Sequence, residues 1–180
     1  MGNVLHRQTR EYRVSVNTPD YDPAEWLVNP SLPDGVPPDR WVVDGDAVRG
    51  PTPQEAAVFD AADLWAAKQN RIAAIDARTA EIVTSGVEVA PGKVVGTTLP
   101  ATQNLQNLVL GVNLGTLDLP QDISTTDGGS YTITGSADLV RVAGLLTLHQ
   151  RTALDAGRAL RAQVLAATSI DAVAAVEDLR

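Results

Sequence analysis

Histidine is the first side chain to consider for acid–base chemistry, and this sequence contains two, His6 and His149. A serine or threonine nucleophile needs such a base within hydrogen-bonding reach. His149 lies inside an apolar repeat that predicts a helix, and we interpret it as a helix-face residue. His6 lies in a start that the pattern leaves unstructured, and no Gly-x-Ser-x-Gly turn is present. The histidines therefore do not predict a nucleophilic enzyme.

Paired carboxylates are the next candidates, because they could bind calcium. They occur at Asp20 and Asp22 and again in Asp44-Gly45-Asp46. A full calcium-binding loop of the EF-hand type is not present here. A turn between two short strands, 41–43 and 47–48, explains the second pair without an ion. We expect no metal, no cofactor and no catalytic residues.

The composition excludes several other classes of protein. The chain has 180 residues with 22 acidic and 14 basic side chains, so its net charge is −8. The only lysines are Lys68 and Lys93 and the arginines are dispersed, which argues against binding to nucleic acid phosphates. No cysteine is present, so disulfides and thiolate metal sites are excluded. No apolar run is long enough to predict a membrane crossing, and Met1–Arg13 is too polar for a signal peptide.

Prolines and aromatic residues concentrate near the N-terminus. Eight of the eleven prolines lie in the first 53 residues, and each removes a backbone donor. A disordered segment is normally poor in aromatic residues. We therefore expect residues 1–51 to form an extended, proline-rich arm that anchors on a neighbouring protein, with a flexible tail as the alternative. The expected anchors are Tyr12, Tyr21, Trp26 and Trp41.

A long helix is predicted over residues 52–85. Thr52 and Glu55 have the spacing of a capping box, and Pro53 suits the first helical position. No proline or glycine follows until Gly86, which is placed to end the helix in a left-handed conformation.

Apolar residues along this helix recur every three or four positions, as in a heptad seam. Two polar residues, Lys68 and Thr79, interrupt the seam. The pattern fits a coiled coil or the buried face of a helix packed within one subunit, and we favour self-association into a homo-oligomer such as a trimer. The expected contact residues are Val58, Trp65, Ile72, Ile75 and Ile82.

The rest of the chain alternates between β and helical patterns. Residues 86–135 predict strands at 87–89 and 94–99, a short helix at 101–113 and a hairpin around Asp127-Gly128-Gly129. Residues 136–180 predict a helix capped by Ser136 and a shorter terminal helix capped near Ser169. The predicted fold class is α+β, with an extended N-terminal arm, a long helix, a small β-hairpin region and C-terminal helices. The predicted domains are 1–51 and 52–180.

Two stretches resemble known proteins. Residues 5–21 (LHRQTREYRVSVNTPDY) and 26–30 (WLVNP) resemble an N-terminal segment of small structural proteins of tailed bacteriophages. Residues 75–83 (IDARTAEIV) and the hairpin 131–134 (YTIT), which runs into the last long helix, resemble a domain of unknown function of phage tail fibre and related tail proteins. Residues 94–119 are richer in Leu and Val than that pattern.

The resemblance implies a non-catalytic virion protein at the tail, baseplate or tail fibre attachment, made in the host bacterial cytoplasm. Its partners would be other phage structural proteins, with no nucleic acid and no membrane. The alternatives are a tail fibre assembly chaperone and a head or neck decoration or fibre protein. A hydrolytic or carbohydrate-binding tail enzyme would need a carboxylate pair in an aromatic cleft. Outside the arm, Tyr131 and Trp65 are the residues that we consider for such a cleft.

Overall fold

The computed structural model describes residues 1–180, and the chain has the predicted α+β fold. It divides into two compact units, an N-terminal unit (Met1–Trp65) and a C-terminal unit (Ala66–Arg180). The long helix α1 (Pro53–Thr84) contributes residues to both units. The division therefore falls within the helix rather than at its start.

Short strands form most of the regular structure in the first 51 residues. They are β1 (Gly2–His6), β2 (Tyr12–Val16), β3 (Trp26–Val28), β4 (Val42–Asp44) and β5 (Ala47–Arg49). The first three form an antiparallel sheet in the order β2-β1-β3, and β4 pairs with β5 in the predicted hairpin. Two short 3-10 helices, Thr18–Asp20 and Pro38–Arg40, lie in the connections. The predicted arm is thus folded back on itself instead of running as one extended strand.

A small core explains why this segment folds back. Leu5, Leu27 and Trp41 are buried together, although Trp41 was expected to be an anchor for a partner. The indole Nε1 of Trp41 donates a hydrogen bond to the carbonyl of Val36 at 2.8 Å, so burial leaves this donor satisfied. The Tyr12 ring packs edge-on against Trp41 with centroids 5.8 Å apart. The small core therefore holds β1, β3 and the residue before β4 together.

The ends of α1 follow the sequence prediction. The backbone N–H of Thr52 donates to the Glu55 carboxylate at 2.7 Å, and the N–H of Glu55 donates to the Thr52 hydroxyl at 3.3 Å. This reciprocal pair is a capping box. Hydrogen bonds from Arg49, and then from Thr52, lower the pKa of Glu55 to about 2. At the other end Gly86 has a φ of +93°, where a side chain would be strained.

Two hairpins and a short helix follow α1. Their bounds are β6 (Val87–Ala90), β7 (Lys93–Val95), α2 (Leu99–Asn113), β8 (Gln121–Ser124) and β9 (Ser130–Ile133). An antiparallel bridge between Val95 and Thr125 joins the two hairpins. The second predicted strand, 94–99, was too long. It ends at Val95, and Pro100 lies in the first turn of α2, where a missing N–H costs nothing.

The C-terminal helices are α3 (Ser136–Ala166) and α4 (Ile170–Ala174). Ser136 is the first helical residue rather than the cap, a position that Gly135 occupies. Ser169 does cap α4, because its hydroxyl accepts a hydrogen bond from the N–H of Ala172 at 3.1 Å. None of the helices combines the length and apolar content that a membrane crossing requires. The main core of the C-terminal unit comprises Val89, Val95, Leu105, Leu108, Ile133, Leu139, Val142 and Leu146.

Candidate functional site: the α1 seam and the C-terminal clasp

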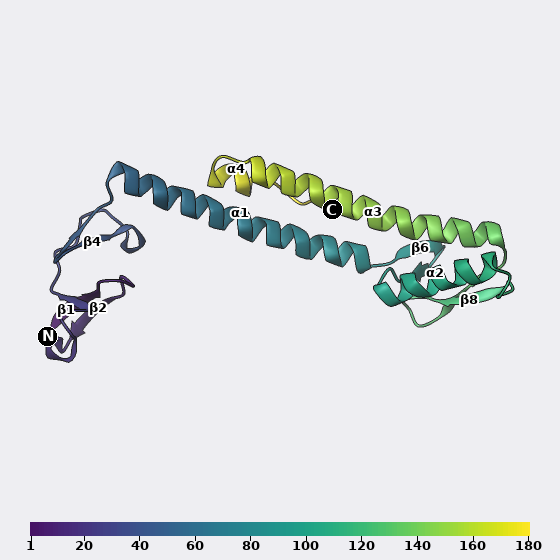
Figure 1. The fold of residues 1–180 in the computed structure, drawn as a ribbon, viewed down its shortest axis with the longest axis horizontal. Helices are drawn as coiled ribbons and strands as arrows, with labels where there is room; N and C mark the ends of the chain where they lie inside the picture. Colours follow the sequence, from purple (N-terminus) through teal and green to yellow (C-terminus); the bar gives the residue numbers. More distant parts are fainter. The chain divides into compact units, whose positions relative to one another are not determined.

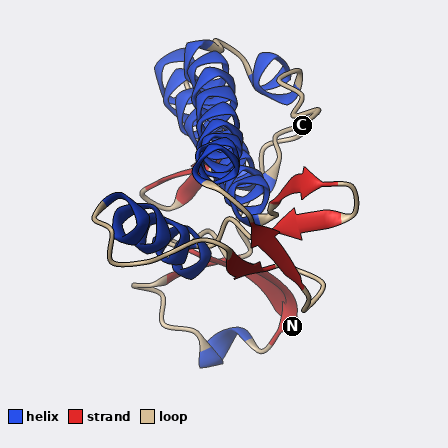
Figure 2. Ribbon diagram, turned by 90° about the vertical axis from the view of Figure 1, so that its right-hand side faces the viewer, coloured by secondary structure: helices blue, strands red, loops and turns tan.

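Within the C-terminal unit, α1 and α3 run side by side in opposite directions. His149 Nε2 lies 2.8 Å from the carbonyl oxygen of Ile82, near one end of the pair. The ion pair between Arg161 and Asp76 spans 3.3 Å further along the pair. Figure 1 shows the two helices beside each other, and Figure 2 views them nearly end-on. Within this helix pair, α3 covers part of the seam predicted on α1.

The C-terminal part of the seam is covered by the subunit itself. Ile75 is only 1% exposed, and Ile72 and Ile82 are half-buried. A Cβ placed on Gly157 of α3 would lie 2.5 Å from the hydroxyl oxygen of Thr79, so this glycine permits the close approach of α3 to α1. Of the two alternatives for the seam, packing within one subunit therefore applies to residues 72–82.

The two polar residues in the seam also have partners inside the C-terminal unit. Lys68 Nζ donates a hydrogen bond to the carbonyl of Leu165, in the last turn of α3, at 2.8 Å. A cation is favourable there because the end of a helix carries unpaired carbonyls and a partial negative charge. The Thr79 hydroxyl donates to the carbonyl of Ile75 at 2.7 Å. Lys68 and Thr79 thus support the fold.

The N-terminal part of the seam contains Val58 and Trp65, which are 68% and 65% exposed. We call these two residues, together with the exposed Ala61 and Ala62 between them, the free seam. The adjacent face of the helix is engaged within the N-terminal unit, where Arg40 donates to the carboxylates of Asp60 and Asp63 and its guanidinium lies 5.3 Å from the centroid of the Phe59 ring. The free seam has no such partner.

Three of the predicted anchor residues remain partly accessible. Tyr12, Tyr21 and Trp26 are half-buried, and Trp26 packs edge-on against Tyr21 with centroids 4.9 Å apart. The guanidinium of Arg13 lies 5.2 Å from the centroid of the Trp26 ring, within the range of a cation–π interaction. Tyr21 and Trp26 thus form a second cluster with Arg13, whereas Tyr12 packs against Trp41 of the small core.

The polar residues considered first for chemistry have structural partners. His6 lies in β1, contrary to the expectation of an unstructured start, and its Nδ1 accepts hydrogen bonds from the N–H groups of Gln8 and Thr9. Asp44 and Asp46 pair with Arg49 and Arg7, respectively. No group of three or more His, Cys, Asp or Glu side chains is placed to hold a metal ion.

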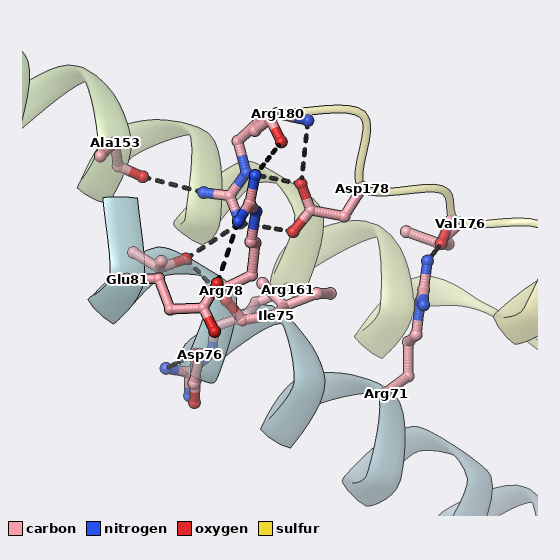
Figure 3. Close-up of polar contacts among 11 residues, drawn as sticks. Arg71, Ile75, Asp76, Arg78, Glu81, Ala153, Arg161, Val176, Asp178 and Arg180 are labelled. Carbon is pink, nitrogen blue, oxygen red and sulfur yellow. Dashed lines mark hydrogen bonds and ion pairs between the residues drawn. The ribbon is translucent and has the colours of Figure 1, made fainter. Parts of the chain in front are cut away.

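A polar cluster that was not predicted from the sequence, the C-terminal clasp, is formed by Arg71, Arg78, Thr79, Asp178 and Arg180. Figure 3 labels all of these residues except Thr79. The guanidinium of Arg180 donates to the Asp178 carboxylate at 2.6 Å, to the Thr79 hydroxyl at 3.0 Å and to the carbonyl of Ala153 at 3.0 Å. One side chain therefore links α1, α3 and the segment after α4. The only sequence signal was the spacing of Asp178 and Arg180.

Two further arginines of α1 bind the backbone of the same segment. Arg71 donates to the carbonyl of Val176, and Arg78 donates to the main-chain oxygen of Arg180 at 3.0 Å. The Nε of Arg71 is buried without a partner. Together these bonds hold the segment after α4 against the helix pair, and Val173 of α4 and Val176 of the segment are buried.

The electrostatics of the clasp favour its ionised form. Hydrogen bonds from the Arg180 side chain lower the pKa of Asp178 to about 2, although burial of the carboxylate acts in the opposite direction. The side chains of Arg180 and Asp178 are only 17% and 11% exposed, so solvent screens this pair less than a surface pair. The clasp can therefore fix helix positions but shows no group poised to transfer a proton.

Taken together, the fold and these contacts define a two-unit α+β protein whose C-terminal unit contains a helix pair closed by a clasp. The chain belongs to the family described as domain of unknown function DUF4376, whose model matches residues 66–178. The match begins at the first residue of the C-terminal unit. No curated protein and no solved structure matches the chain.

Proposed function

We propose that this chain is a non-catalytic structural component of a tailed bacteriophage virion, located at the tail, baseplate or tail fibre attachment. Its N-terminal unit would dock on a neighbouring subunit, and its C-terminal unit would supply a rigid helical body. The resemblance of residues 5–21 and 26–30 to phage structural proteins supports the virion assignment.

The free seam is the observation that best supports a role in assembly. Val58 and Trp65 lie seven residues apart on a helix face whose other members are uncharged. Contiguous exposed apolar surface of this kind typically marks an interaction site. Association of α1 segments from several copies would bury both side chains in a short coiled coil. The proposal therefore includes a homo-oligomer, with a trimer as one arrangement.

Quantitative mass spectrometry of purified virions tests the proposal. A structural component should occur at a fixed copy number relative to the major capsid protein, after particles are washed in high salt. An assembly chaperone would be abundant in infected-cell lysate and absent from the particles. Finding the chain only in the lysate would contradict the virion role and support the chaperone alternative.

A further inference from the structure

The N-terminal unit contains a groove with a volume of about 440 Å³. One side is lined by the consecutive residues 26–31 and the other by the consecutive residues 46–48, with Arg7 and Pro23 completing it. Successive side chains of a strand point to opposite faces of its sheet. A groove on one face of the sheet would therefore be lined by alternate residues of the strand only. Consecutive lining residues indicate that the edges of β3 and β5 border the groove.

The edge of β3 that faces away from β1 has a backbone unit available for pairing. The N–H of Asn29 donates to the carbonyl of Asn3 at 2.7 Å, and the N–H of Arg7 donates to the carbonyl of Glu25 at 2.8 Å. Hydrogen bonding alternates along an antiparallel strand. Val28, which precedes Asn29, therefore directs its N–H and C=O away from β1. Its side chain is 43% exposed.

The edge of β5 offers a second such unit. Asp44 pairs with Ala47 across a two-residue turn, and Val43 pairs with Val48 one step further. The pair that closes a two-residue hairpin is hydrogen-bonded, so the next pair is not. Val48 therefore also directs its backbone N–H and C=O outward, on the hairpin that borders the groove.

The charges of the groove already neutralise each other. Arg7 donates to the carbonyl of Gly45 and to the carboxylate of Asp46, both at 2.6 Å, and no other charged residue lines the groove. The chain's own extended connection cannot easily fill the groove, because Pro30, Pro33, Pro37 and Pro38 lack the N–H groups that pairing requires. Because β5 borders the groove opposite β3, a strand that enters the groove would lie between two strand edges.

We propose that this groove accepts one extended, uncharged polypeptide strand from a neighbouring protein, which adds to the free edge of β3. Main-chain hydrogen bonds to Val28 supply affinity in this mode of recognition, and contacts with Trp26 and Val48 select the side chains. The inference rests on the proposed function, since a neighbouring structural subunit would donate the strand. The N-terminal unit is then an acceptor of a strand rather than an arm that inserts into another protein.

A peptide titration of the full-length chain, followed by backbone amide NMR, tests the inference. The probe is a blocked hexapeptide of alternating threonine and valine, and its control is the same peptide with alternate backbone amides methylated. Saturable shifts of the Val28 and Val48 amides are expected with the probe only. The absence of shifts at millimolar peptide would overturn the inference. Shifts that depend on protein concentration in the absence of peptide would also overturn it, because the occupant of the groove would then be a second copy of this chain.

Two matched variants sharpen the test. Val28→Pro removes the outward N–H and leaves the bonds of Asn29 to β1 intact, so it should weaken peptide binding about tenfold or more. Val28→Ala keeps the N–H and should change affinity by about twofold or less. The NMR signal of the Trp41 indole N–H reports whether the unit remains folded in Val28→Pro. If it does not, Val48→Pro provides the same test from β5.

Equal binding by wild type and a folded proline variant would overturn the strand acceptor. The virion measurement stays independent of this result. Peptide binding by a chain absent from virions would refute only the proposed function, whereas a chain present in virions that binds no peptide would refute only the acceptor groove.

Discussion

The two units of this protein are stabilised in different ways. The N-terminal unit has a core cluster of three buried side chains, Leu5, Leu27 and Trp41, and a fourth buried residue, Val4. The C-terminal unit has a cluster of eight buried side chains and, beyond it, a helix pair with its own buried residues such as Ile75 and Val164. Because stability grows with the apolar area buried, we expect the N-terminal unit to be the weaker of the two.

Arginine contacts show the same contrast. Arg7 and Arg40 in the N-terminal unit pair with carboxylates that remain exposed, Asp46 by 90% and Asp60 by 73%. Pairs of this kind contribute little to stability. In the clasp, both partners of the Arg180–Asp178 pair are largely covered. The same chemistry therefore orients loops in one unit and holds helices together in the other.

The largest effect is expected from Leu5→Ala, which tests whether the N-terminal unit depends on its small core. Leu5 is fully buried, and replacing such a residue by alanine typically costs about 2–5 kcal/mol. This is comparable to the total stability of a small domain. We expect the environment of Trp41 to become solvent-like in fluorescence and near-UV circular dichroism, while the helical signal of α3 persists.

Val14→Ala is the control for this experiment, because Val14 lies in the same sheet and is 61% exposed. It should leave the Trp41 signal unchanged. If Leu5→Ala instead unfolded both units in one transition, the contrast between an independent weak unit and a stable one would be wrong.

Gly157→Ala tests the close packing of the helix pair. The added Cβ would lie 2.5 Å from the Thr79 hydroxyl and 3.2 Å from the Arg180 guanidinium, so α3 or α1 must shift. Overpacking of this kind costs about 1–3 kcal/mol. Gly144 on the same helix has open space around it, so Gly144→Ala should stabilise the protein by about 0.5–1 kcal/mol through helix propensity. Denaturant unfolding of the two variants should give changes of opposite sign.

The clasp predicts a specific dependence of stability on pH. The folded pKa of Asp178, about 2, lies below the value of about 3.9 for an unfolded aspartate. The carboxylate therefore contributes stability that is complete above pH about 4 and is lost as the pH falls towards 2. Asp178→Asn should lower the free energy of unfolding by about 1–2 kcal/mol at neutral pH and by much less near pH 2.

Chemical denaturation across this pH range measures the difference between wild type and variant. Asp155→Asn is the control, because Asp155 also pairs with an arginine, Arg158, but at an exposed site. A destabilisation by Asp178→Asn that is unchanged from pH 7 to pH 2 would contradict the role assigned to its charge.

Local signals in the sequence predicted most elements after residue 51, whereas the strands β1, β2 and β3 were not predicted. The capping box at Thr52 and the glycine at position 86 gave the ends of α1, and the Asp127-Gly128-Gly129 turn gave the hairpin between β8 and β9. These features depend on residues close together in the chain, whose backbone preferences act whatever the tertiary structure.

Long-range features were not predicted. The burial of Trp41 depends on Leu5 and Leu27, which are distant in sequence, and proline content alone favoured an extended arm. The clasp joins Arg180 to Thr79 and Ala153, a contact that no periodicity reveals. The seam has two environments, because α3 covers residues 72–82 within the C-terminal unit and no such partner covers Val58 and Trp65 within the N-terminal unit.

Trp65→Ser tests the free seam and should have the smallest effect on the folded chain itself. Trp65 is 65% exposed, so its replacement should leave the free energy of unfolding of the monomer almost unchanged. An exposed tryptophan that anchors an interface nevertheless often contributes 2 kcal/mol or more to association. We therefore expect the association constant, measured by light scattering or sedimentation over a concentration series, to fall by about tenfold or more.

Val140→Ser is the control, because it removes an equally exposed apolar side chain from α3 and should leave association unchanged. If the wild-type chain stays monomeric at high concentration, or if both variants associate equally, the free seam is not an association surface. The two units would then differ in their cores alone.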